Sequence, residues 1–180
     1  MIIIRIEGLV KTRPCQGKKM TFKILQPPKN RNSAQSTLET KIDSLGAAAQ
    51  FSIFAIRVWS SAAHQKMPLE VALGNIFADF QCTKVLNVFD ECMTLMAVAA
   101  LRKVNIGCCP SNEHVVGDEA VILKCFRELE RGDTNTALSK MDGIIISSLK
   151  PTFCRTAQTY VKHLNRCGLA FKTPNVLSLV

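Results

Sequence analysis

The sequence predicts an all-α protein, a compact orthogonal or irregular bundle of five to six helices. From residue 38 onward, apolar residues recur at helical spacing in one segment after another. The chain shows no alternation of strand and helix patterns, as a fold built of βαβ units would require. With 180 residues, 47% of them hydrophobic, it is long enough to bury one core.

The composition divides the chain into three parts. We expect residues 1–37 to be a basic, flexible tail and linker, because Pro27-Pro28 and the polar run that follows cannot build a packed face. We expect residues 38–172 to form a single helical domain and residues 173–180 to be a C-terminal tail.

The first helix is predicted over residues 38–64. Two apolar stripes at helical spacing indicate that most of its circumference is buried, so we expect it at the centre of the bundle. A membrane span over residues 45–63 is rejected, because a central Arg57 costs about 2.5–3.5 kcal/mol on insertion. The two stripes are Ile42, Leu45, Ala49, Ile53, Ile56 and Ala63, and Ala47, Phe51, Phe54, Val58 and Ala62.

Two further helices are predicted before a long loop. Pro68 fits the first turn of a helix that runs to about Phe80. A third helix is predicted over residues 82–103, followed by a loop over residues 105–117. The residues expected to face inward are Leu69, Leu73, Ile76 and Phe77, and then Val85, Phe89, Cys92, Met96 and Ala99.

The C-terminal half is predicted to begin with a helical hairpin. A fourth helix over residues 118–131 ends at Gly132, and Asp133 suits the N-cap of a fifth helix over residues 134–149. The end of the fifth helix contains three consecutive isoleucines, which also favour a strand. This hairpin is not expected to recognise DNA, because the fifth helix offers few basic or amide side chains.

A last helix is predicted to start with Pro151 in its first turn and to end at Cys167, before Gly168. Its spacing places three apolar residues on the buried side. These are Ala157, Val161 and Leu164.

The stretch NIGCCPSNEHVVGDE, residues 105–119, gathers the residue types that carry metal or thiol chemistry. A zinc ion takes four thiolate, imidazole or carboxylate ligands, usually with paired ligands two to four residues apart. The CxxC spacing is missing, because the two cysteines are adjacent. The candidate metal ligands, with zinc as the ion, are Cys108, Cys109, His114 and Cys125.

Two other interpretations of this loop stand beside the metal site. As a redox site, the neighbouring cysteines would form a reducible disulfide, with Cys109 kept extended and exposed by Pro110. As a simple connector, which we favour, Asp118 caps the following helix and Glu119 complements its dipole.

The eight cysteines are interpreted as reduced thiols of a cytoplasmic protein. No apolar signal region is visible, because Arg5 and Glu7 interrupt the N-terminal run of isoleucines. Translation is expected to start at either Met1 or Met20.

The net charge of +9 is concentrated at the N-terminus. Residues 1–33 hold eight basic residues and one acidic residue, whereas residues 34–180 are nearly neutral. An arm of this kind is either a solvated extension or a site for polyanions, so nucleic acid is expected only there. The candidate polyanion-binding residues are Arg13, Lys18, Lys19, Lys23, Lys29 and Arg31.

No catalytic motif stands out. The sequence has no GxSxG, no HExxH and no phosphate-binding glycine loop, and His64 and His163 are expected at helix surfaces. The sequence therefore favours a non-enzymatic helical interaction or regulatory module that binds a protein partner or itself. Its expected exposed anchors are Trp59, Met93 and Phe171.

The loop and the hairpin resemble an uncharacterised family of small all-helical bacterial proteins. The similarity covers residues 45–170 and rests on GCCP, then GDE, then the helix-Gly-Asp-helix hairpin. In that family the cysteines stand one residue apart and Asp-Glu follows closely, whereas here the cysteines are adjacent and the gap is longer. The resemblance implies a bacterial helical domain and no particular activity.

Overall fold

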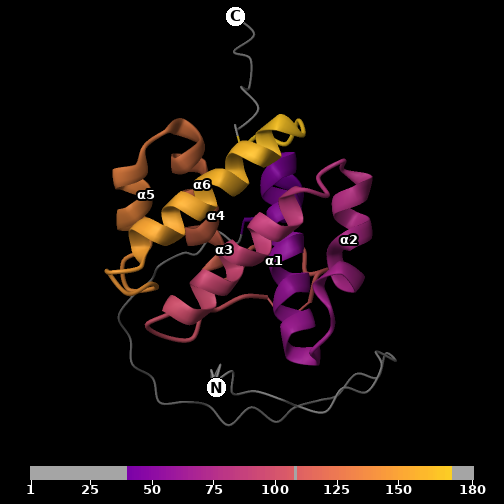
Figure 1. Cartoon of the computed structure of the whole chain (residues 1–180), viewed down its shortest axis with the longest axis horizontal. Helices are drawn as coiled ribbons and strands as arrows, with labels where there is room; N and C mark the ends of the chain where they lie inside the picture. The colour runs from indigo at the N-terminus through magenta and orange to yellow at the C-terminus, as the bar shows by residue number, and fades with distance from the viewer. Residues whose placement is uncertain (1–39, 108, 172–180) are drawn as a thin grey trace, which may run out of the picture.

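The computed structural model describes residues 40–107 and 109–171. Within these residues there are helices and no strand, so the predicted all-α class and the compact bundle are confirmed (Figure 1). A short 3-10 helix, η1 (Ile42–Ser44), precedes six α-helices. These are α1 (Ala47–Gln65), α2 (Leu69–Asp79), α3 (Val85–Ala99), α4 (Glu119–Arg131), α5 (Thr134–Lys140) and α6 (Lys150–Arg166).

One continuous row of aromatic rings holds the bundle together. Each ring packs against the next with centroids between 4.9 and 5.8 Å apart, in edge-to-face or tilted geometry. The row joins α1, α2, α3, α6 and α4 to the segment after α6, so these elements share one core. Its members are Phe51, Phe77, Phe89, Tyr160, Phe126 and Phe171.

The helix boundaries are right where a proline, a glycine or a cap defines them. Pro68 directly precedes α2, and Pro151 lies in the first turn of α6. Gly132 ends α4 with φ of +83°, a conformation that glycine adopts without strain. Asp133 caps α5, because its Oδ1 accepts a hydrogen bond from the Thr136 N–H at 2.9 Å.

The third and fifth helices end earlier in the structure than predicted. The fifth ends at Lys140 instead of residue 149, and Ile145 forms a β-bridge with Ala100. This pairing also ends α3 at Ala99 instead of residue 103. Leu101 N–H donates to the Ile144 carbonyl at 2.8 Å, and Ile146 N–H donates to the Ala99 carbonyl at 2.9 Å.

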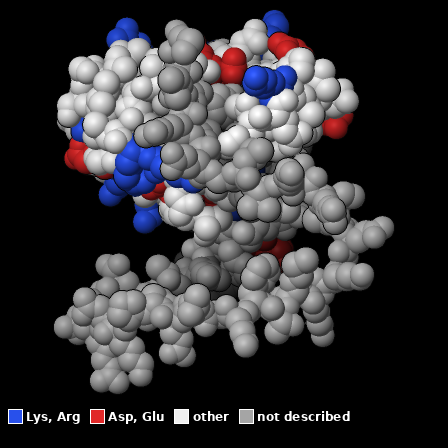
Figure 2. All heavy atoms as spheres, turned by 90° about the horizontal axis from the view of Figure 1, so that it is seen from below, with Lys and Arg blue, Asp and Glu red and all other residues white. Residues whose placement is uncertain are grey.

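The first helix also starts later than predicted, at Ala47 rather than residue 38, with Gly46 as its N-cap. Within the described part of the chain, no helix combines the length and apolar character needed to cross a bilayer. On the face shown in Figure 2, one group of Lys and Arg side chains lies together, and other basic and acidic side chains are scattered among uncharged surface.

Two of the three expected anchors are core residues. Met93 and Phe171 are buried, so the prediction that they are exposed was wrong. Trp59 is half-buried, and its Nε1–H donates to Asp90 Oδ1 at 2.8 Å. Within residues 40–107 and 109–171, the exposed large apolar side chains are instead Phe54, Met67, Val71, Phe80, Val98 and Leu101.

Candidate functional site

The loop between α3 and α4 is built around a buried ion pair. Arg57 comes from the middle of α1, and Glu119 is the first residue of α4. Both side chains are 0% exposed, with Nε to Oε1 at 2.7 Å and Nη2 to Oε2 at 2.8 Å. The two parallel contacts give the bidentate geometry in which an arginine pairs best with a carboxylate.

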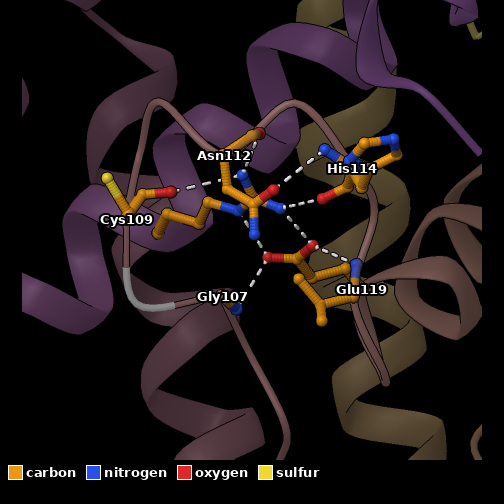
Figure 3. Close-up of polar contacts among 7 residues, drawn as sticks. Gly107, Cys109, Asn112, His114 and Glu119 are labelled. Carbon is orange, nitrogen blue, oxygen red and sulfur yellow. Dashed lines mark hydrogen bonds and ion pairs between the residues drawn. The ribbon is translucent and has the colours of Figure 1, made fainter. Parts of the chain in front are cut away.

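The remaining N–H groups of the guanidinium donate hydrogen bonds to carbonyl groups of the loop. Nη1 donates to the carbonyl of Asn112 at 2.7 Å and to that of Cys109 at 3.3 Å, and Nη2 donates to that of His114 at 2.7 Å. Figure 3 shows these carbonyls turned inward toward the guanidinium. All five N–H groups of Arg57 therefore have acceptors, which a buried arginine requires.

The carboxylate is equally well satisfied. The N–H of Gly107 donates to Glu119 Oε1 at 3.0 Å, and the N–H of Val116 donates to Oε2 at 2.8 Å. Gly107 has no room for a side chain, because a Cβ there would lie 2.8 Å from Arg57 Nε. The loop is thus shaped around the ion pair from both sides.

A second ion pair links the two ends of the loop. Arg102 donates to both oxygens of Asp118, at 2.8 and 2.7 Å, and the Asn105 N–H donates to Asp118 Oδ2 at 2.7 Å. The hydrogen bond from Arg102 holds the pKa of the Asp118 carboxyl below its usual value. Asp118 was predicted to cap α4, but no side-chain capping hydrogen bond forms there.

The segment that follows residues 1–39 attaches to the same loop. The N–H of Val115 donates to the Thr40 carbonyl at 3.0 Å, and the N–H of Ile42 donates to the Glu113 carbonyl at 2.7 Å. Lys41 and His114 form an antiparallel β-bridge. The loop therefore lies between the start of the described chain and the buried ion pair.

Cys109 is an exposed thiol of this loop. Its carbonyl faces Arg57, whereas its sulfur points away from the guanidinium (Figure 3). The sulfur lies 2.9 Å from Ser111 Oγ. Hydrogen bonds from the side chain and backbone of Ser111 lower the pKa of the Cys109 thiol, and the charge of Arg57 adds to this effect.

The structure places the four predicted metal ligands in different surroundings. Cys109 is exposed and His114 is half-buried, whereas Cys125 is fully buried. A hydrogen bond with Cys154 of α6, together with burial, raises the pKa of the Cys125 thiol. Among the described residues no group of three His, Cys, Asp or Glu side chains could hold a metal ion. Cys108 lies outside the described residues, so zinc binding by this set stays a prediction.

The candidate polyanion-binding residues also lie outside the described part of the chain, and that hypothesis likewise stays a prediction. They are Arg13, Lys18, Lys19, Lys23, Lys29 and Arg31.

The sequence interpretation missed the ion pair at the centre of the loop. Glu119 was expected only to complement the dipole of α4, whereas in the structure it is buried against Arg57. One signal was available: an arginine inside an otherwise apolar helical segment needs a buried acidic partner. The partner itself could not be named, because it lies 62 residues away.

Comparisons of this chain with models of protein families, with curated proteins and with solved structures find no match. The resemblance to a family of small bacterial proteins therefore stays a prediction as well.

Proposed function

We propose that this protein is a non-enzymatic helical interaction module that binds a protein partner through the outer side of α2. The partner we propose first is a second copy of the same chain. The observation that carries the proposal is the 71% exposure of Val71 on this helix. An aliphatic side chain gains about 1.5–3 kcal/mol when it is fully buried, so such a residue favours association.

Other exposed apolar side chains lie on α1 and at the two ends of α2. Met67 precedes α2 and Phe80 follows it, and both are exposed. Phe80 packs edge-on against Phe51 of α1 with ring centroids 5.0 Å apart, and Phe54 lies one turn further along α1. Since α2 lies at the edge of the bundle, a partner can approach it without moving another helix (Figure 1). We define the α2 surface as Val71 together with Met67, which lie four residues apart at the start of α2.

The test is the mass of the full chain in solution over a wide range of concentrations. We expect the wild type to self-associate in sedimentation equilibrium and Val71→Glu to shift the protein toward monomer by at least tenfold in dissociation constant. Asn135→Glu is the matched control, because it adds the same charge at an exposed site on α5, on the opposite side of the bundle (Figure 1). A wild type that stays monomeric, or equal effects of both variants, would refute self-association through α2.

A second function, thiol redox chemistry at Cys109, is favoured by its exposure and its lowered pKa. In this hypothesis the Cys109 thiolate and the neighbouring Cys108 thiol reduce a disulfide oxidant such as oxidised glutathione. The two thiols give up two electrons and two protons, form a bond between their sulfurs, and release two reduced glutathione molecules.

The redox hypothesis is tested by intact-mass measurement after treatment with oxidised glutathione. We expect the wild type to lose the mass of two hydrogen atoms and Cys109→Ser not to do so. Cys167→Ser is the control, because Cys167 is also partly exposed and lies at the end of α6 instead of in the loop. Equal mass loss in all three proteins would contradict a disulfide at this position.

A further inference from the structure

The last helix has an unbalanced charge. α6 holds four Lys or Arg residues and no Asp or Glu in KPTFCRTAQTYVKHLNR. The remaining charged residues from 34 to 180 are close to balanced in sign. In a nearly neutral domain, a helix usually carries both acidic and basic residues. The uniformly positive charge of α6 therefore needs an explanation.

Three of the four basic residues of α6 fall on its solvent side. One side of the helix is buried in the core, where Tyr160 packs against Phe89 and Phe126 and lies 2.9 Å from the Ser52 hydroxyl. On the other side, exposed residues follow at spacings of four, three and four, which places them in one line along a helix. We call this line the α6 stripe; it consists of Arg155, Thr159, Lys162 and Arg166.

The cations of the α6 stripe are not neutralised by the described part of the chain. Lys150, at the start of the helix, pairs with Asp142. By contrast, Arg155, Lys162 and Arg166 form no ion pair with any residue in the described ranges. Among the described residues, three cations of α6 therefore lack an ion-pair partner, on a helix whose other side packs in the core.

The side chains beside the stripe are also suited to a polyanion. Thr152 and Asn165 are exposed, and Gln158 is half-buried. Hydroxyl and amide groups donate hydrogen bonds to phosphate oxygens, and Asn and Gln also contact base edges. From Arg155 to Arg166 the helix rises about 16 Å, at about 1.5 Å per residue.

We propose that the α6 stripe binds the phosphate backbone of double-stranded DNA. Lysine and arginine release counterions from DNA when they contact phosphates, and this supplies the binding energy. The major groove of B-form DNA is about 12 Å wide and accepts an α-helix, whereas that of duplex RNA is too narrow. The connection from α5 to α6, residues 141–149, is longer than the tight turn of a helix-turn-helix, so the proposal concerns backbone contact and not the recognition of a particular sequence.

The test measures binding of the full chain to a fluorescein-labelled DNA duplex of 20 base pairs by anisotropy, at several salt concentrations. The stripe variant Arg155→Glu/Lys162→Glu is compared with Lys124→Glu/Lys140→Glu, which makes the same charge change at exposed lysines of α4 and α5. We expect the stripe variant to bind about tenfold or more weakly and its salt slope to fall by about 2, one for each phosphate that the variant no longer neutralises. The control should stay within about threefold of the wild type, because only a general field effect is removed.

Several results would overturn the proposal. Equal losses in both variants would mean that net charge alone attracts DNA, and wild-type binding by the stripe variant would assign DNA binding to residues 1–33 instead. Equal or tighter binding to duplex RNA of the same length would overturn the choice of DNA as the ligand, because duplex RNA offers the same phosphates beside a major groove too narrow for a helix. Binding to vesicles with anionic lipid, lost in the stripe variant while DNA binding is absent, would identify a membrane surface as the partner.

Discussion

Arg57 and Glu119 are separated by 62 residues in the chain, yet their side chains meet through two N–O contacts of 2.7 and 2.8 Å inside the core. The pair fastens the middle of α1 to the first residue of α4. Because the carbonyls of Cys109, Asn112 and His114 bind the same guanidinium, the conformation of the loop depends on this contact.

Replacing Arg57 by methionine should destabilise the protein by about 3–5 kcal/mol, because it leaves a buried carboxylate without its partner. Loss of this size is a large share of the stability of a small domain. Urea unfolding followed by circular dichroism measures it. A loss below about 1 kcal/mol would show that water reaches Glu119.

The double variant Arg57→Met/Glu119→Leu separates the ion pair from the loop contacts. If the uncompensated carboxylate causes most of the loss, the double variant should be more stable than Arg57→Met alone. It should not regain wild-type stability, because three loop carbonyls still lack a donor. The stability of Arg57→Lys is expected to lie between that of Arg57→Met and that of the wild type, since a lysine keeps the charge and loses the forked geometry.

Gly107→Ala should destabilise the protein by about 1–3 kcal/mol, because overpacking forces a shift of the buried guanidinium. An added Cβ would lie 2.8 Å from Arg57 Nε. Gly74→Ala is the matched control, since Gly74 lies inside α2 with nothing within 4 Å of the added Cβ. It should stabilise the protein by about 0.5–1 kcal/mol through helix propensity. If the loop is packed as described, thermal or urea unfolding should show a loss of stability in Gly107→Ala and a gain in Gly74→Ala.

The sequence predicts the helices best where a single residue sets a local conformation. Pro68, Gly132, Asp133 and Pro151 each act through their own backbone or side chain, and the helix ends at these positions are right. The run of isoleucines at 144–146 suits a helix or a strand equally. Its conformation is decided by pairing with Ala100, which lies far away in sequence.

The same distinction holds for the site. The sequence correctly indicated a loop between two helices, with Cys109 exposed. It could not indicate that Glu119 is buried, because a carboxylate in the first turn of a helix is usually exposed. Met93 was placed wrongly because apolar spacing does not show which stripe of a helix faces a neighbour. Phe171 follows α6 and belongs to no helical stripe, so spacing could not indicate that it packs against Phe126.

Replacing Asp118 by asparagine should lower stability by about 1–2 kcal/mol at neutral pH, since charged hydrogen bonds from Arg102 and the Asn105 N–H are removed. The folded-state pKa of Asp118 lies below its ordinary value of 3.8. Its stabilisation is therefore present above about pH 4 and disappears as the pH falls through the folded-state pKa. Urea unfolding of both proteins at pH 7, 5, 4 and 3 should show this gap closing. A gap independent of pH would rule out the ionised carboxylate as its source.

Ser111→Ala should raise the pKa of Cys109, because the hydrogen bond from Ser111 is the main cause of its lowered value. The rate of alkylation by iodoacetamide follows the thiolate fraction, so its midpoint should move to higher pH. Peptide mass spectrometry assigns the modified cysteine. Cys82 serves as an internal reference, because burial raises the pKa of its thiol to about 12. An unchanged alkylation profile at Cys109 would show that Arg57 and the backbone set its reactivity without the hydroxyl.

Tyr160→Phe should destabilise the protein by about 1–3 kcal/mol, because it leaves a buried hydroxyl without its partner. The Tyr160 hydroxyl lies 2.9 Å from Ser52 Oγ, and both side chains are buried where α6 meets α1. Ser52→Ala/Tyr160→Phe removes both polar groups and should recover most of the loss, so a double-mutant cycle in urea yields the coupling. A double variant no more stable than Tyr160→Phe would mean that Ser52 finds another acceptor. Because α6 carries the proposed DNA-binding stripe on its outer side, Tyr160→Phe should also leave DNA affinity unchanged wherever the protein is folded.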